Sequence, residues 1–355
     1  MTQNLRLKQK MLSEQLRDIF LKNKDPFTEI LGQEQAKQGL KSALLMNRHI
    51  IIVGAPGIGK TTLAKNIAKL LPDINVVEGC SYHCIPDNLV CPSCKQQKKH
   101  KTTKINGSKR FIRIQGSPDL TVEDLLGDID PIKALKFGPL SLEAFTPGKI
   151  FKANNGILFF DELNRCPEKL QNAMLQVLEE RKATIGSYDI DFDINFIFIG
   201  TMNPEDTSTE KLSDVLLDRF DIIYMDYPEN IGIEKKIVLM KSRKMANVSE
   251  ELLTLMVYFV RLLRVDEKLE KKPSVRASIG LYERAQSNAL LNGRKNVQFE
   301  DIKEVLVSVL SHRIRLKPSV RYLESVENYI KEQFHKNIET TKWQNNLEEK
   351  SGDLR

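Results

Sequence analysis

Long apolar runs are missing from this chain, and so are the marks of a repeat or disulfide-stabilised protein. No apolar stretch approaches the roughly 20 residues that a membrane-spanning helix needs. The segment Met1 to Phe20 is charged throughout, which does not fit a secretory signal. No internal repeat is found. Only five cysteines are present, and four of them fall within fifteen residues, so a disulfide framework is not expected. We therefore expect no membrane span and a cytoplasmic location.

The composition is that of a globular protein large enough for two domains. The chain has 355 residues, of which 41% are hydrophobic and 28% charged. The formal net charge is +7, and part of this excess lies between Lys95 and Arg113. Such a segment could contact phosphates, although a solvated basic loop is the commoner explanation.

Strand-like and helical patterns alternate between residues 28 and 228. Short apolar runs that predict strands are Ile50–Val53, Arg110–Ile114, Ile157–Phe160, Phe196–Gly200 and Ile222–Met225. Several are almost entirely apolar, as in parallel sheets that are covered on both faces. Helices are expected between them, for example from Pro167 to Glu180. This pattern predicts a doubly wound α/β nucleotide-binding domain.

The remaining segments give the domain plan. An N-terminal helical segment is expected over 1–27, since Leu5, Leu12, Leu16, Ile19 and Phe20 lie roughly at helical spacing. From about residue 229 the patterns are helical only, with Ser249 and Ser274 as expected N-caps, so we predict an all-helical domain over 229–343 and a polar tail over 344–355.

Two insertions interrupt the α/β pattern. The first, residues 72–109, is longer than usual for a connection and needs stabilisation of its own. The second, 182–195, alternates Asp189, Asp191 and Asp193 with apolar residues, which predicts a strand with an acidic face and a hairpin turn near Gly186.

The most informative motif follows the first predicted strand. It is a glycine-rich turn with a Lys-Thr pair that leads into a helix, and its residues are Gly54, Ala55, Pro56, Gly57, Ile58, Gly59, Lys60, Thr61 and Thr62. Glycines allow the backbone to wrap around a phosphate, and the helix N-terminus favours negative charge. This layout is typical of a phosphate-binding P-loop, in which Lys60 reaches the β- and γ-phosphates and Thr61 holds Mg²⁺. The alternative is a glycine-rich turn without a ligand.

Polar residues at the ends of later strands complete the predicted chemistry. Asp161 and Glu162 end an apolar strand, where Asp161 would meet the Mg²⁺ shell and Glu162 would orient or deprotonate the attacking water. Asn203 ends the next strand and could bond that water or a phosphate oxygen. Arg219 precedes the last strand and could act as an arginine finger on ATP of a neighbouring subunit, or form a surface pair with Asp218.

Taken together, these motifs resemble an AAA+ ATPase, and one branch in particular. Segments similar to the magnesium-chelatase I-subunit and MoxR-type ATPases are Gly32-Gln33, Gly127–Leu135, Asp161–Arg165, Gln171–Met174 and Leu217–Phe220. In that branch an insertion interrupts the second core helix, matching 117–149, and a hairpin precedes the sensor-1 strand, matching 182–195. The resemblance covers roughly residues 26 to 310 and implies a P-loop α/β domain over 28–228 with a helical lid.

The resemblance also implies how such a subunit works. ATP would be hydrolysed with Mg²⁺ at the interfaces of a homo-oligomeric ring, expected to be a hexamer. Arg276, in Pro273-Ser-Val-Arg-Ala277, is the best match to the sensor-2 arginine of the lid. A separate partner with a von Willebrand factor A-type domain would be the protein that the motor serves.

The cysteine spacing departs from the common family pattern. Cys80, Cys84, Cys91 and Cys94 suit a tetrahedral structural site, and Zn²⁺ fits it better than an iron–sulfur cluster. The surrounding loop, with Pro86 and Pro92, is not expected to bury a core of its own, so metal would supply its folding energy. The nearby His83 and His100 are interpreted as solvent-facing neighbours, although either could substitute as a ligand. Cys166 is interpreted as a small apolar residue.

Three functions remain open at this point. The first is a chelatase-like or MoxR-like remodelling ATPase. The second is a nucleic-acid motor that uses the basic residues beside the cysteines, namely Lys98, Lys99, Lys101, Lys104, Lys109 and Arg110. The acidic hairpin argues against it. The third is a nucleotide-gated scaffold without hydrolysis, against which the intact Asp161-Glu162 pair argues.

Overall fold

The computed structural model describes residues 12–138, 141–180, 182–185, 190–204 and 212–339. Within these ranges two compact units are found. The first is an α/β unit made of the described residues up to 225, except 31–33 and 55–58. The second is a helical unit made of these two short segments and residues 226–339.

A parallel sheet of five strands forms the centre of the α/β unit, in the order β11-β1-β10-β7-β4. The strands are β1 (His49–Val53), β4 (Phe111–Gln115), β7 (Gly156–Asp161), β10 (Phe196–Met202) and β11 (Phe220–Tyr224). All four neighbouring pairs are parallel. The sheet predicted from the five apolar runs is thus confirmed, with boundaries shifted by one or two residues.

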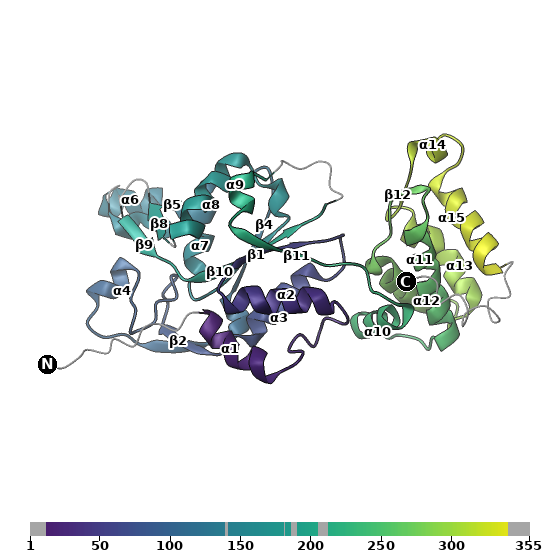
Figure 1. Ribbon diagram of the computed structural model, residues 1–355, viewed down its shortest axis with the longest axis horizontal. Helices are drawn as coiled ribbons and strands as arrows, with labels where there is room; N and C mark the ends of the chain where they lie inside the picture. The colour runs from purple at the N-terminus through teal and green to yellow at the C-terminus, as the bar shows by residue number, and fades with distance from the viewer. Residues whose placement is uncertain (1–11, 139–140, 181, 186–189, 205–211, 340–355) are drawn as a thin grey trace. The chain divides into compact units, whose positions relative to one another are not determined.

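Helices cover both faces of this sheet, which explains why its central strands are apolar on both sides. Figure 1 shows α2 and α3 on one side and α8 and α9 on the other. Ile50, Ile51 and Ile52 of β1 are all fully buried, although successive side chains point to opposite faces. The helices of this unit are α1 (Leu12–Lys22), α2 (Glu34–Leu45), α3 (Lys60–Leu70), α4 (Pro92–Gln96), α5 (Val122–Leu126), α6 (Pro131–Phe137), α7 (Lys149–Lys152), α8 (Glu168–Glu180) and α9 (Asp214–Leu217).

Within the described residues of the α/β unit, three antiparallel strand pairs lie outside the central sheet. They are β2 (Ile74–Val77) with β3 (Thr102–Ile105), β5 (Gly127–Ile129) with β6 (Phe145–Pro147), and β8 (Lys182–Ile185) with β9 (Ile190–Asp193). The last pair occupies the segment expected to form a hairpin, whose turn and Asp189 lie outside the described residues. Short 3₁₀ helices cover Gly107–Arg110, Leu142–Ala144 and Leu163–Arg165.

The segment 72–109 differs from expectation because it joins the core of the α/β unit. Its antiparallel strand pair was not predicted, and Val77 and Val90 are buried in the same apolar cluster as residues of the central sheet. Cys84, Cys91 and Cys94 are buried there too. The loop is therefore stabilised by apolar contacts with the core of the α/β unit, which its proline and polar residues did not indicate.

The second unit is almost entirely helical. Its helices are α10 (Ile231–Lys241), α11 (Glu250–Val265), α12 (Val275–Leu291), α13 (Phe299–Leu310), α14 (Pro318–Arg321) and α15 (Val326–Phe334), followed by a π-helical turn over His335–Glu339. Ser249 and Ser274 cap α11 and α12 with their side chains, as predicted. One short strand pair, β12 (Leu269–Lys271) with β13 (Arg315–Leu316), was not predicted.

Candidate active site and cysteine cluster

The glycine-rich loop lies between β1 and α3, as its sequence predicts. Gly57 and Gly59 have φ angles of +80° and +106°, which favour glycine. The helix α3 begins at Lys60, and no side chain caps its N-terminus. Backbone N–H groups at the start of a helix attract anions when no side chain accepts from them. This local structure suits a phosphate group.

The ammonium group of Lys60 is held within the same loop. Its Nζ donates a hydrogen bond to the backbone carbonyl of Gly54, at the end of β1. A phosphate in the loop would offer this ammonium a charged acceptor in place of a neutral carbonyl, and charge-assisted hydrogen bonds are the stronger kind.

The sheet brings the carboxyl ends of three strands together. β1 pairs with β10, and the Gly54 N–H donates to the Met202 carbonyl at 3.2 Å. β10 pairs in turn with β7, which ends at Asp161. Because parallel strands end at one edge of a sheet, the phosphate loop, Asn203 and the Asp161-Glu162 pair lie along that edge. Asn203 directly follows β10, so the three sequence motifs share one edge.

Thr201 organises the acidic pair, and the sequence analysis did not identify it. Its hydroxyl donates to Asp161 Oδ1 at 2.7 Å and accepts the Glu162 N–H at 2.9 Å. Thr201 is fully buried on β10. Glu162 adopts a φ of +57°, which is uncommon for a residue with a side chain and must be held by its surroundings. The signal was a lone polar residue in an otherwise apolar strand.

The backbone at Gly116 also lies very close to the backbone of the acidic pair. Gly116 donates its N–H to the Asp161 carbonyl at 2.7 Å. A Cβ at Gly116 would lie 2.1 Å from the Glu162 carbonyl oxygen, so only glycine fits there.

Two side chains of β4 pair with the two carboxylates. Arg113 donates to Asp161 Oδ2 at 2.6 Å, and Gln115 Nε2 donates to Glu162 Oε2 at 3.0 Å. Arg165 also lies 3.2 Å from Glu162 Oε2. Sequence alone could not find these pairs, because they depend on the register in which Gln115 lies opposite Asp161. Each of the two carboxylates therefore has a side-chain partner on β4.

Arg219 is already paired within its own unit. It donates to Glu179 Oε2 at 3.0 Å and to the Val215 carbonyl at 3.1 Å, and lies 3.6 Å from Asp218. The expected surface pair with Asp218 is therefore present, and Glu179 is a closer partner. Action on a neighbouring subunit stays a prediction, since Arg219 would have to leave these partners.

The two remaining motif residues lie in the helical unit. Arg276 occupies the first turn of α12, and its N–H donates to the Ser274 hydroxyl at 3.3 Å. Gln33 has a φ of +64° and its amide bonds both the N–H and the carbonyl of Asp226. The roles expected for these residues stay predictions.

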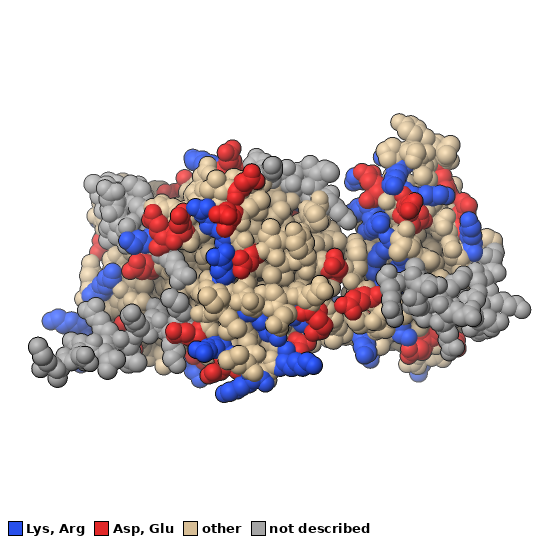
Figure 2. All heavy atoms as spheres, in the orientation of Figure 1, with Lys and Arg blue, Asp and Glu red and all other residues tan. Residues whose placement is uncertain are grey.

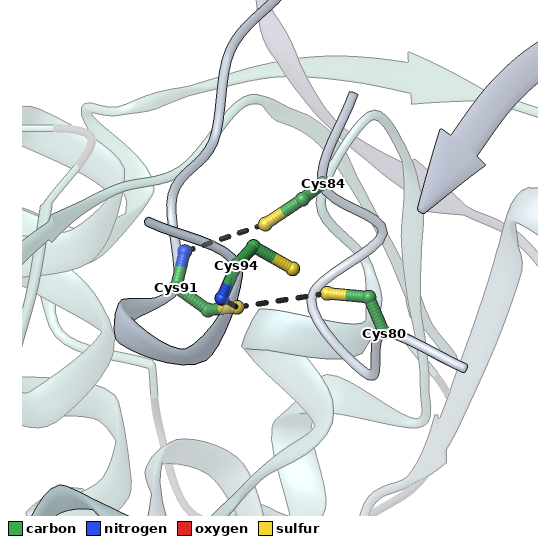
Figure 3. Close-up of side chains that lie close together, drawn as sticks. All are labelled: Cys80, Cys84, Cys91 and Cys94. Atoms are coloured by element: carbon green, nitrogen blue, oxygen red, sulfur yellow. Dashed lines mark hydrogen bonds between the residues drawn. The ribbon is translucent and has the colours of Figure 1, made fainter. Parts of the chain in front are cut away.

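The four cysteines predicted to bind metal converge on one point (Figure 3). Their Sγ atoms lie within 4.8 Å of one another, and the Sγ atoms of Cys80 and Cys91 are 3.7 Å apart. All four are free thiols. Backbone N–H groups of Val90 and Cys91 donate to Cys84 Sγ at 3.2 and 3.3 Å. The cluster thus combines four sulfurs with N–H donors that stabilise negative charge on them.

The close packing of the four cysteines shifts the pKa values of their thiols in opposite directions. Hydrogen bonds with Cys80 and Cys91, together with burial, raise the pKa of Cys84. The same contacts lower the pKa of Cys80, because its thiolate accepts bonds from Cys84 and Cys91.

The two histidines near the cluster do not belong to it. The group of metal-ligating atoms contains the four sulfurs only, among the residues that the structure describes. The Nδ1 atoms of His83 and His100 are buried without a hydrogen-bond partner. Both histidines were expected to face solvent, and this expectation is wrong because the Nδ1 atom of each ring is buried. Cys166 is fully buried, as expected for a small apolar residue.

Arg110 is buried, so the expectation that it contacts phosphates is wrong. It is 1% exposed and donates to the carbonyls of Asn155 and Pro72 and to Gln15 Oε1. Burial lowers its pKa to about 10, which leaves it charged at neutral pH. The neighbouring lysines at 98, 99, 101, 104 and 109 are exposed.

Comparisons with known proteins agree with these motifs. Residues 26–106 match the family "Magnesium chelatase, subunit ChlI", residues 91–222 match the "ATPase family associated with various cellular activities (AAA)", and residues 261–331 match the "AAA lid domain". One chain in a model of the BchI–BchD complex of magnesium chelatase is similar at 22% identity and a TM-score of 0.47, covering 84% of this chain and 98% of that chain. At this TM-score and identity, the likeness does not identify the family of the chain.

Two relatives span almost the whole chain. A magnesium-chelatase subunit ChlI homolog of Methanocaldococcus jannaschii is 28% identical, covering 88% of this chain and 93% of the relative. Magnesium-chelatase subunit ChlI of Nephroselmis olivacea is 31% identical, covering 89% and 93%. The predicted resemblance, fold class and ATPase activity are thereby confirmed. The chain belongs to the magnesium-chelatase I-subunit (ChlI) family of AAA+ ATPases.

Proposed function

We propose that this chain is the ATP-hydrolysing subunit of a chelatase-like or MoxR-like complex, in which it remodels a partner protein. The observation that supports this most is the shared edge of β1, β10 and β7. There the phosphate loop, Asn203 and the Asp161-Glu162 pair lie together. The relatives are named as subunits of a chelatase, which supports an activity that needs further chains.

The residues at this edge fit ATP and Mg²⁺. Uncapped N–H groups at the start of α3 and the ammonium group of Lys60 suit the phosphates, and the hydroxyl of Thr61 with Asp161 suits a hard cation. Mg²⁺ would neutralise charge on the transferring phosphoryl group. Residues 54–62 hold the phosphates, Glu162 orients or deprotonates the water, and Asn203 bonds the water or a phosphate oxygen.

Further roles extend beyond one subunit. We propose a ring, expected to be a hexamer, in which Arg219 acts on ATP of the neighbouring subunit and Arg276 of the lid senses the γ-phosphate. The partner is expected to carry a von Willebrand factor A-type domain, and the location is expected to be cytoplasmic. The ring, the roles of the two arginines and the partner are expected from the family resemblance, and the location is the default expectation from the sequence. In the described part of the chain, every helix is too short or too polar to cross a bilayer.

Zn²⁺ is the proposed occupant of the four-cysteine site. With Zn–S bonds of about 2.3 Å, a tetrahedral site places its sulfurs about 3.8 Å apart. The distance of 3.7 Å between Cys80 and Cys91 Sγ fits this value, and all four sulfurs lie within 4.8 Å. Zinc would neutralise the thiolates and supply folding energy to the loop.

The nucleic-acid motor receives no support from the relatives. One of its six proposed basic contacts, Arg110, is buried, and Asp193 of the hairpin is exposed. On the face shown in Figure 2, basic and acidic side chains are interspersed.

ATPase assays with candidate activators test the proposal. Turnover is expected to change when a co-purifying partner protein is added, and to be indifferent to DNA and RNA at low salt. Stimulation by nucleic acid that steepens as salt is lowered would contradict the remodelling role and favour the motor.

A further inference from the structure

The four-cysteine loop, residues 80–94, also reaches into the α/β unit through the side chain of Tyr82. Tyr82 lies between Cys80 and Cys84. Its ring packs edge-on against Phe151 of α7, with centroids 5.2 Å apart, and stacks on Phe192 of β9 at 5.9 Å. Phe151 and Phe192 meet each other at 5.5 Å. One side chain of the cysteine loop thus joins α7 to the β8–β9 hairpin.

Two backbone carbonyls of the same turn hold a pair of asparagines. Tyr82 O accepts from Asn154 Nδ2 at 2.9 Å, and His83 O accepts from Asn155 Nδ2 at 3.1 Å. Both asparagines are 3% exposed. A buried amide group without a hydrogen-bond partner costs free energy, so the positions of these two carbonyls stabilise the asparagines.

Both asparagines also hydrogen-bond the backbone of Asn195, and these bonds link the starts of two strands of the active site. Asn154 Oδ1 accepts the Asn195 N–H at 3.0 Å, and the Asn155 N–H donates to the Asn195 carbonyl at 2.6 Å. Asn155 immediately precedes β7, which ends at Asp161, and Asn195 immediately precedes β10, which carries Thr201. The phosphate loop follows β1, which takes no part in these bonds.

The turn that makes these contacts needs support from outside. His83 has a φ of +45°, a strained conformation for a residue with a side chain. Cys80 and Cys84 flank this turn directly, while Cys91 and Cys94 come from the start of α4. A cation bound to all four sulfurs would therefore fix both ends of the turn that presents the Tyr82 ring and the two carbonyls.

We propose that the metal-loaded cysteine loop is a brace for the catalytic strands, with Tyr82 as its positioning residue. The brace holds the starts of β7 and β10 and the adjoining β8–β9 hairpin. This inference rests on the metal site proposed above. Loss of metal lowers ATP turnover with little change in KM for ATP, because β7 and β10 carry the acidic pair and its threonine whereas β1 leads into the phosphate loop.

Hydrogen exchange on the full chain without nucleotide tests the brace. Peptides that cover residues 151–157 and 190–200 are compared in the Zn²⁺-loaded protein, in protein stripped by a zinc-selective chelator, and in Tyr82→Ala. Stripping and Tyr82→Ala are each expected to speed exchange in both peptides about tenfold, since two aromatic contacts are lost or loosened. Tyr82→Phe keeps the ring and is expected to exchange like the unchanged protein.

Zinc content and kinetics separate the brace from the metal site. Tyr82→Ala is expected to keep its zinc while kcat falls and KM for ATP stays the same. The double variant Cys91→Ser, Cys94→Ser is expected to lose zinc, and Cys166→Ala, which changes the remaining cysteine, is expected to retain it.

Three results would overturn the inference. Unchanged exchange in zinc-bearing Tyr82→Ala would refute the brace and leave the metal site standing. Unchanged exchange after stripping would show that metal does not order these strands. Failure of the protein to take up added Zn²⁺ would refute the metal site and the brace together, while ATP hydrolysis by the unchanged protein would leave the proposed motor intact. Should the cysteine variant not fold, Tyr82→Ala still decides the matter.

Discussion

At the residue scale, the acidic pair depends on a threonine hydroxyl. Thr201 bonds both the Asp161 carboxylate and the Glu162 N–H from a fully buried position. These two bonds orient the carboxylate and hold the left-handed backbone of Glu162, whose φ is +57°. A side chain of the same shape without a hydroxyl would leave the Glu162 N–H without its acceptor.

Thr201→Val is therefore expected to lower kcat for ATP about tenfold or more, since an unsatisfied buried donor costs about 1–3 kcal/mol. KM for ATP is expected to change little, because the phosphate loop is not altered. Steady-state ATPase assays measure both constants. Thr201→Ser keeps the hydroxyl and is the matched control, and an unchanged kcat in Thr201→Val would refute this role.

At the element scale, a buried ion cluster holds the helical unit together. Glu234 of α10 is fully buried and accepts two bonds from Arg264 of α11, at 2.5 and 2.6 Å. Ser278 of α12 donates to the same carboxylate at 2.6 Å. Arg264 also donates to the Pro273 carbonyl at 2.8 Å, just before the helix that carries Arg276. One carboxylate thus joins three helices.

Glu234→Ala is expected to destabilise the helical unit by about 3–5 kcal/mol, because it leaves a buried guanidinium group without its anion. Urea denaturation followed by far-ultraviolet circular dichroism measures the loss. Glu250→Ala removes an exposed carboxylate that pairs with Lys235, and as the control it is expected to cost far less. Equal losses in the two variants would contradict the importance of the buried cluster.

A second carboxylate makes the stability of this unit depend on pH. Burial by itself would raise the pKa of Asp301, but bonds from Arg294 and from the Gln298 N–H outweigh it and hold the pKa below its usual range. Because the folded pKa is the lower one, the stabilisation is present above pH 4 and is lost as the pH falls through the folded value. Asp301→Asn is expected to be less stable than the unchanged protein by about 1–3 kcal/mol at pH 7.

This difference is expected to shrink between pH 5 and pH 3, where Asp301 of the unfolded chain takes up its proton. Denaturation curves of both proteins across that range provide the check. A difference that stays constant with pH would mean that charge on Asp301 does not contribute.

The elements that sequence predicted are those with a strong local pattern. β1, β7 and β10 of the central sheet are apolar and buried over nearly their whole length, and β4 and β11 each contain a short apolar run, so a few residues identify each strand. β3 has three exposed polar residues and could not be found that way. The burial of Arg110 and the pairs of Arg113 and Gln115 depend on strand register and on carbonyls far away in sequence, which no local pattern contains.

At the scale of the whole molecule, the account requires residues from two subunits at each ATP site. Lys60 would act within its own subunit and Arg219 on the neighbour. Arg219 is 28% exposed and pairs with Glu179, whose side chain is 61% exposed. Exposed pairs of this kind contribute little to stability. The arginine could therefore exchange partners at modest cost.

Lys60→Ala and Arg219→Ala are each expected to be inactive alone and to regain part of the activity when mixed. A mixed interface can combine an intact phosphate loop from one subunit with an intact Arg219 from the other. ATPase assays on the separate and mixed proteins measure the effect, with thermal melts to show that both variants are folded. Mixtures that stay inactive would contradict action between subunits.

The most direct measurement of the central claim compares Glu162→Gln with the unchanged protein for ATP–Mg²⁺ binding by calorimetry and for turnover. The account predicts binding of similar affinity and a turnover lower by about 10²–10⁴-fold, because the general base is gone while the phosphate loop is intact. Turnover by Glu162→Gln at the rate of the unchanged protein, or no binding heat with either protein, would contradict it.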